Sequence, residues 1–279
     1  MIGDLFHDAT VGQYVHWSSS VSGTASAVGA GGTSFDPTNV AGNDFSHSAY
    51  GKLGTWAETA QGSKVWVATN ADGVKQWVML EGSTRPFLYS EYSTTIHNAH
   101  QLQLIEMDLG ARYTLANDVN ASMTNAPGSM WSEAGFSPLG RGLAGVSQFT
   151  GVLDGNYHVV HDLHIDRGRE TRVGLIGLAS INSMIRNIGM EGGTVVGASV
   201  VGPLVAFNEG QISQSYAAMD TRAEEYAGGL VGFNRGDIDQ SFSQGTLYVE
   251  KNFAGGLVGG HAAGNINQSY SSTDRKSVV

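Results

Sequence analysis

The chain has 279 residues, of which 39 are glycine, none is cysteine and only 14% are charged. This length suits one elongated domain or two compact ones, and the absence of cysteine excludes disulfides and thiol chemistry. A formal charge of −10 argues against nucleic acid or an anionic membrane surface as a partner. No stretch reaches the ~18 consecutive apolar residues of a membrane span, so no membrane insertion is expected.

Residues 1–92 predict an irregular, β-rich N-terminal segment. Apolar residues are scattered without a helical period up to about residue 60. Beyond that point, Val65–Val67 and Trp77–Met79 flank the sequence Asn-Ala-Asp-Gly at positions 70–73. Because Asp-Gly favours a tight turn between strands, this stretch predicts a β-hairpin.

Three tryptophans lie in or next to this hairpin, at Trp56, Trp66 and Trp77. Aromatic side chains of this kind suit cross-strand packing in a small core. Exposed tryptophans also form platforms for sugar rings, so a glycan contact at these three residues is an alternative interpretation.

One short amphipathic helix is predicted over residues 98–109. Asn98 can cap its N-terminus, Gln101 can reach back as in a capping box, and Gly110 can end it. The apolar positions that share a helical face are Ala99, Leu102, Ile105 and Leu109. We expect this helix to pack on the side or end of the domain that follows.

The most informative stretch runs from Gly202 to Tyr270, where nearly the same sequence occurs three times. The copies are GPLVAFNEGQISQSY, GLVGFNRGDIDQSF and GLVGGHAAGNINQSY, which start at Gly202, Gly229 and Gly256. Equivalent positions recur at intervals of 26 and 28 residues. These positions are Ile212, Ile238 and Ile266; Gln214, Gln240 and Gln268; and Tyr216, Phe242 and Tyr270. A fixed period in this range is typical of stacked repeat folds.

Each copy contains short apolar runs separated by Gly and Asn, which fit strands and are too short for stable helices. The repeat therefore predicts an all-β fold, a right-handed parallel β-helix over residues 93–279, with one coil per repeat. About six or seven coils are expected from Tyr113 onward. Strict alternation places Ile212, Gln214 and Tyr216 inward, as aliphatic, amide and aromatic ladders. Asn208 and Asn234 occupy equivalent corners, where they are expected to satisfy backbone groups.

The second copy, GLVGFNRGDIDQSF, resembles the GLUG motif of large bacterial exoproteins of the filamentous-haemagglutinin type. The first and third copies match less well, because Pro203 and Ala206 replace motif residues in one and His261 replaces Asn in the other. The stretch from Arg85 to Val119 also resembles the lead-in to such repeats. The resemblance implies export by a two-partner or related route, and a role as an adhesin stalk.

Candidate chemistry is sparse. The carboxylates available for acid–base work on a polysaccharide are Asp154, Asp162, Asp166, Asp237 and Asp239, and no spacing makes them converge. His158, Asp162 and His164 share one face of an extended strand, but residues four apart on a strand lie about 13 Å apart, too far for one ion. We therefore expect no catalytic residue, no metal site and no cofactor.

Together with the repeat, the resemblance to the GLUG motif implies a non-enzymatic structural fragment of a large secreted or surface bacterial adhesin, a rigid stalk for attachment or biofilm. Its expected partners are neighbouring repeats of the same longer chain and a surface glycan or protein. The first twenty residues lack a basic start and an apolar core, so they predict no signal peptide and an internal position in an exported protein. A carbohydrate-binding module and a β-helical polysaccharide lyase or hydrolase are the alternatives.

Overall fold

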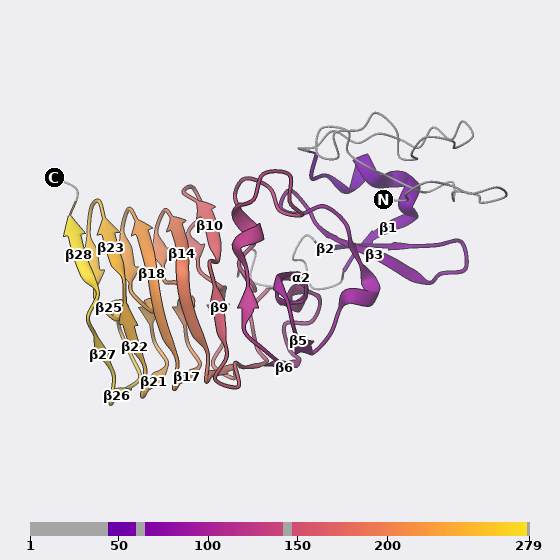
Figure 1. The fold of residues 1–279 in the computed structure, drawn as a ribbon. Coiled ribbons are helices and arrows are strands. Elements are labelled where there is room, and N and C mark those ends of the chain that lie inside the picture. The colour runs from indigo at the N-terminus through magenta and orange to yellow at the C-terminus, as the bar shows by residue number, and fades with distance from the viewer. Residues whose placement is uncertain (1–43, 60–64, 142–146, 278–279) are drawn as a thin grey trace.

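The computed structural model describes residues 44–59, 65–141 and 147–277. The expectation for residues 1–43 lies outside this part of the chain. The described residues form an N-terminal antiparallel sheet, a short helix and a long stack of parallel strands, in that order along the chain (Figure 1). The stack is a β-solenoid, as the repeat predicts.

The N-terminal part contains the predicted hairpin. Its sheet has the order β1 (Thr55–Glu58), β2 (Val65–Thr69), β3 (Lys75–Leu80) and β4 (Phe87–Leu88), and all pairs are antiparallel. In the turn between β2 and β3, the Asn70 side chain accepts hydrogen bonds from the backbone N–H groups of Asp72 and Val74. Two 3₁₀ helices flank the sheet, η1 (His47–Leu53) and η2 (Tyr89–Glu91).

The helix is present but shorter than predicted. It spans α2 (Ala99–Leu104) and continues only as a 3₁₀ turn, η3 (Ile105–Met107). The Asn98 side chain accepts from the backbone N–H of Gln101, and the Gln101 side chain accepts from the backbone N–H of His97, one residue before the cap. Ala99 and Leu102 are fully buried, so this turn of helix packs its apolar face inward as expected.

Four parallel sheets make up the walls of the solenoid. The first wall, in chain order, has seven strands: β5 (Thr95–Ile96), β6 (Arg112–Leu115), β8 (Val152–Asp154), β13 (Met184–Arg186), β17 (Gln211–Ser213), β21 (Asp237–Asp239) and β26 (Ile266–Asn267). Two walls have four strands each: β11 (Arg172–Val173), β15 (Val200–Val201), β19 (Tyr226–Gly228) and β24 (Phe253–Gly255); and β12 (Ile176–Ala179), β16 (Val205–Asn208), β20 (Val231–Asn234) and β25 (Val258–His261).

The remaining wall has nine strands, because some coils contribute two strands to it. They are β7 (Val119–Asn120), β9 (Val159–His161), β10 (His164–Arg167), β14 (Gly189–Gly197), β18 (Tyr216–Ala223), β22 (Phe242–Gln244), β23 (Thr246–Val249), β27 (Tyr270–Ser271) and β28 (Asp274–Ser277). Figure 1 shows these strands side by side along the stack, ending in the yellow β28.

The described residues form four complete coils of the solenoid, not the six or seven expected. Only the coils that begin at β11, β15, β19 and β24 contribute to every wall. Between β7 and β8 the chain leaves the stack for an excursion that includes the 3₁₀ turn η4 (Ser122–Asn125). The excursion returns to the stack through isolated parallel bridges from Leu139 to Ile176 and from Phe149 to Ala179. The earlier coils are therefore incomplete, although their strands extend two of the walls.

A continuous apolar core runs through both parts, from Val65 in the N-terminal sheet to Val249 in the third complete coil. The repeat leucines Leu204 and Leu230 are fully buried in this core, and Leu257 in the last coil is partly buried against it. The glycine before Leu230 is required by close approach of the next coil. Gly229 donates its N–H to the Gly256 carbonyl at 2.8 Å, and a Cβ on Gly229 would lie 2.2 Å from that oxygen.

The packing of this core gives a stability prediction. We expect Ile238→Ala to lower the free energy of unfolding by about 2–5 kcal/mol, because Ile238 has no exposed surface and the truncation leaves a cavity between two coils. Denaturant unfolding followed by circular dichroism measures the change. Ile181→Ala is the matched control, since Ile181 is 76% exposed, and we expect almost no effect there. Equal losses in the two variants would contradict the stacked core.

Candidate functional site

The isoleucines of the repeat stack directly on one another along the seven-stranded wall. Ile212 pairs with Ile238, and Ile238 pairs with Ile266. The same column extends toward the N-terminus through Ile185, Leu153 and Tyr113. Ile212 and Ile238 are buried, whereas Ile266 in the last coil is 38% exposed. The column therefore has a closed end and an open end.

The predicted inward facing of the glutamines and of the aromatic residues is wrong. Gln214, Gln240 and Gln268 adopt φ of +48°, +46° and +46° and are exposed. This left-handed backbone turns the chain at a corner between two walls. The alternation between inward-facing and outward-facing side chains therefore restarts one residue later. The amide stack therefore lies on the outer surface, where Gln240 donates to Gln268 at 3.0 Å.

The aromatic residues also stack on the outside. The Tyr216 and Phe242 rings lie 4.7 Å apart with an interplanar angle of 1°, and Phe242 and Tyr270 lie 5.2 Å apart at 5°. The Tyr216 hydroxyl donates to Glu191 at 2.5 Å. Burial and this carboxylate raise the pKa of Tyr216 to about 12. The stack is a flat aromatic strip on the outer surface of the nine-stranded wall.

Serines fill the inward positions that were assigned to Gln and Tyr. The backbone N–H of Ser215 donates to Ser241 Oγ at 3.3 Å, and that of Ser241 donates to Ser269 Oγ at 3.1 Å. Ser215 and Ser241 are each 1% exposed. A small hydroxyl can satisfy the backbone at a corner without filling the core. The residue after each left-handed corner faces inward, and in all three copies that residue is a serine.

The asparagine ladder at the opposite corner is present as predicted. Asn208 and Asn234 are fully buried, and the Asn208 side chain donates to Asn234 Oδ1 at 2.7 Å. Each side chain also donates to a carbonyl two residues further along, at Gly210 and Gly236. In the last coil His261 takes the place of Asn, and its Nδ1 lies 3.3 Å from Asn234 Nδ2.

The three tryptophans lie on the same face of the N-terminal sheet, and this face is covered by η1. The Trp56 Nε1 donates to the Tyr50 carbonyl at 2.9 Å, and Trp56 and Trp77 pack against the cluster of Tyr50, Leu53 and Met79. Trp66 stacks on His47, with ring centroids 3.6 Å apart. These contacts are those of core packing between the sheet and η1, and His47 covers one ring face of Trp66.

Most of the candidate carboxylates lie on different strands, and only Asp237 and Asp239 share one, on either side of Ile238 in β21. Asp154 and Asp239 lie on the same wall but are three strands apart, which is roughly 14 Å at the spacing of neighbouring strands. Glycoside hydrolysis needs two carboxyl groups within roughly 5–10 Å. Asp237 instead accepts from the backbone and side chain of Asn265.

The histidines and aspartates around β9 and β10 do not form a metal site. His158 pairs with Asp118 at 3.1 Å and His164 with Thr194 at 2.8 Å. Asp162 has φ of +56°, so it breaks the single extended strand that the sequence predicts there. Among the described residues, no group of three His, Asp or Glu side chains could hold a metal ion.

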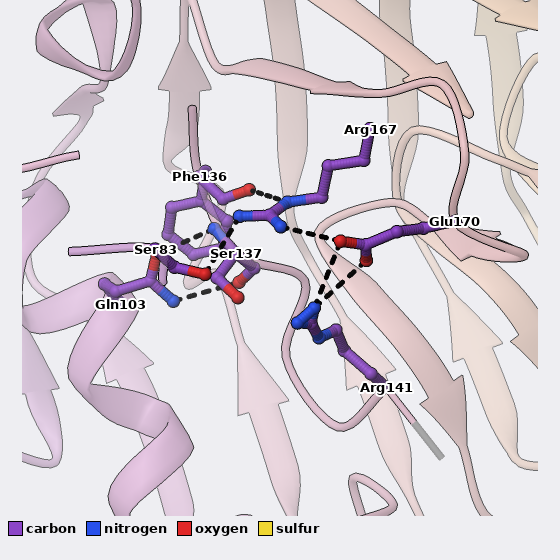
Figure 2. A network of polar contacts seen from close by, with 7 residues as sticks. All are labelled: Ser83, Gln103, Phe136, Ser137, Arg141, Arg167 and Glu170. Atoms are coloured by element: carbon purple, nitrogen blue, oxygen red, sulfur yellow. Dashed lines mark hydrogen bonds and ion pairs between the residues drawn. The ribbon is translucent and has the colours of Figure 1, made fainter. Parts of the chain in front are cut away.

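A buried polar network, which the sequence did not predict, joins the N-terminal part to the solenoid (Figure 2). Arg167 at the end of β10 donates to the Phe136 carbonyl at 3.2 Å, to Ser83 Oγ at 3.3 Å and to Glu170 at 2.8 Å. Glu170 also receives two bonds from Arg141. Burial lowers the pKa of Arg167, whereas the charge of Glu170 opposes that shift. The network connects segments that are up to 84 residues apart in sequence.

Gln103 of α2 anchors the excursion by the same kind of contact. Its side chain donates to the Ser137 carbonyl and accepts from the Ser137 N–H, both at 2.9 Å, and it accepts from Trp131 Nε1 at 2.8 Å. Gln103 is fully buried. The helix therefore fixes the excursion against the first coils through one satisfied amide.

The stacked coils define the chain as a β-solenoid protein. A 130-residue part, 46% of the chain, is 38% identical to Halomucin of Haloquadratum walsbyi (strain DSM 16790 / HBSQ001). The match covers only 1% of Halomucin, so the chain is similar to a small part of a very large protein. No family model and no solved structure matches the chain. Among the described residues, no helix is both long enough and apolar enough to cross a membrane.

Asp154 supports a prediction about pH. Burial alone raises its pKa, but hydrogen bonds from the Asn156 N–H and from the side chains of Asn187 and Arg186 hold the pKa below its ordinary value. We expect Asp154→Asn to cost about 1–3 kcal/mol of unfolding free energy at neutral pH. A lowered folded-state pKa stabilises the protein above the unfolded value of about 3.9, and this contribution is lost as the pH falls through the folded value.

The two proteins should therefore converge in stability in acid, which denaturant unfolding at a series of pH values would show. Asp239→Asn is the control, because Asp239 occupies the aligned position on β21 and its carboxylate makes no hydrogen bond or ion pair with the described residues. A constant difference between wild type and Asp154→Asn from neutral to acidic pH would contradict the assignment.

Proposed function

We propose that the chain is a structural, non-catalytic segment of a large secreted or cell-surface protein, in which the solenoid serves as a rigid stalk for attachment. The observation that carries this proposal is the unbroken stack. The column from Tyr113 to Ile266 crosses six strands of one wall without a gap, and the backbone ladders run beside it. A rod held by continuous ladders transmits force along its length and keeps two ends apart.

The similarity to Halomucin supports a place within a longer protein. The matched region is a very small part of that relative, as expected if such a segment is one piece of an extended surface protein. The composition agrees, because few charges and many small polar residues suit an exported, turn-rich β fold. The resemblance of Gly229–Phe242 to the GLUG motif of giant adhesins points in the same direction.

The exposed residues of the last coil indicate what packs against this end of the stack. In the last coil Ile266, Phe253 and Tyr270 are 38%, 57% and 57% exposed, whereas the equivalent Ile238 is buried. Within the described residues no strand pairs with the outer edge of this last coil, and such an edge is a template for further pairing. We infer that further coils of the same longer chain cover this end, since only a repeat of the same period matches every column at once.

The positions of the polar residues support a role without catalysis. The carboxylates considered for acid–base work are spread over several coils, and Asp154 is bound by three donors that hold it in one place. The packing of Trp56, Trp66 and Trp77 under η1 does not favour a carbohydrate-binding platform in the N-terminal sheet.

Insertion of extra coils tests the stalk. Three copies of residues 226–252, placed in tandem after Asn252, should lengthen the particle by about 14 Å, because each coil adds one strand spacing of about 4.8 Å. Small-angle X-ray scattering measures the maximum dimension. A scrambled insert of equal composition is the control and should add disordered mass without a matched, rigid increase. A compact particle of unchanged length with the repeat insert would contradict the proposal, as would release of new sugar ends from a panel of polysaccharides.

A further inference from the structure

An arginine-rich pocket lies at the junction between the N-terminal sheet and the solenoid, next to the network of Figure 2. Its volume is about 430 Å³, within the range of roughly 300–1,000 Å³ typical of small-molecule sites. The lining consists of Glu81, Gly82, Ser83, Arg141, Arg167, Arg169, Glu170, Thr171 and Arg172. Three separate segments line this pocket. They are the turn after β3, the excursion between β7 and β8, and the β10–β11 connection.

The pocket is positively charged in an acidic protein. Four arginines against two glutamates leave a local formal charge of +2, whereas the whole chain carries −10. Both glutamates are already engaged, because Glu81 pairs with His47 at 2.9 Å and Glu170 bridges Arg141 and Arg167. Arg169 is exposed and has no carboxylate partner among the described residues. The local field therefore attracts a small anion.

Two of the four arginines, Arg141 and Arg167, are held in place by hydrogen bonds within the protein. The Arg167 side chain is 5% exposed and is fixed by Phe136, Ser83 and Glu170. The two bonds of Arg141 to Glu170 both use Nη1, and a guanidinium carries five N–H donors in a fixed plane. Because guanidinium groups match carboxylates in a bidentate geometry, a preformed pair of this kind favours a carboxylate ligand.

The rest of the lining is hydrophilic. Apart from the charged side chains it offers Ser83, Thr171 and the backbone of Gly82, and none of the described residues that line it is aliphatic or aromatic. A lining of this kind suits a ligand that carries an acid group and several hydroxyls. We propose that this pocket binds a small carboxylate-bearing saccharide, such as a uronic acid unit. The proposal does not depend on the stalk function.

Calorimetric titration of the complete chain with digalacturonate at low ionic strength tests this, with neutral digalactose and a tetra-aspartate peptide as comparison probes. We expect digalacturonate to bind and digalactose not to bind. Added salt should weaken the binding, because the contact is between charges. Arg169→Gln should weaken it about tenfold, the loss expected for one charge-assisted hydrogen bond.

Arg112→Gln is the matched control, since Arg112 is exposed on β6 and does not line the pocket, and it should bind as the wild type does. Arg169 is exposed, so circular dichroism should show an unchanged fold in its variant. The proposal is overturned if digalacturonate does not bind, if its affinity survives Arg169→Gln, or if the neutral sugar binds equally well. Tighter binding of the aspartate peptide would assign the pocket to an acidic peptide and also overturn it.

Discussion

The structure depends on the parallel backbone ladder, which places each residue about 4.8 Å from its counterpart in the next coil. Side chains in one column must therefore tolerate each other at contact distance, and like charges in adjacent coils repel. The low charge content of the chain follows from this constraint. Where charges do stack, they alternate, and Asp154 lies beside Arg186 in the neighbouring strand with 2.8 Å between carboxylate and guanidinium. Glycine, serine and asparagine recur because each fits a fixed local geometry at every turn.

The repeat was sufficient to predict the solenoid, the Ile212–Ile238–Ile266 column and the asparagine corner, because periodicity directly reports which residues become neighbours. The facing of Gln214 and Tyr216 was not predictable by alternation. A non-glycine residue at φ of +48° interrupts the alternation, and nothing in the residue type of glutamine announces that conformation. The coil number was overestimated for a related reason, since strands of the incomplete early coils have the same local pattern as those of complete coils.

The arginine pocket and its network could not be predicted either, because their residues are distant in sequence and follow no motif. Arg167 meets Ser83, and Gln103 meets Ser137, only when the N-terminal sheet and the excursion fold against the first coils. The repeats therefore predict the solenoid, whereas the arginine pocket and the polar network lie at the junction, outside the repeats. A stalk and a binding pocket are compatible in one chain because the columns and the junction use different residues.

The two ends of the stack differ in how well their apolar residues are buried. Ile96 and Leu115 at the N-terminal end are fully buried, and Gln103 joins the overlying excursion to α2 through satisfied hydrogen bonds. In the last described coil, Leu257 and Val258 are only partly buried and Ile266 is 38% exposed. Interior coils pair with a coil on each side, whereas the last described coil pairs only with the one before it, so amide protection against hydrogen exchange should decline toward β28. Local unfolding would then begin at the β28 end of the stack and proceed toward the N-terminal coils.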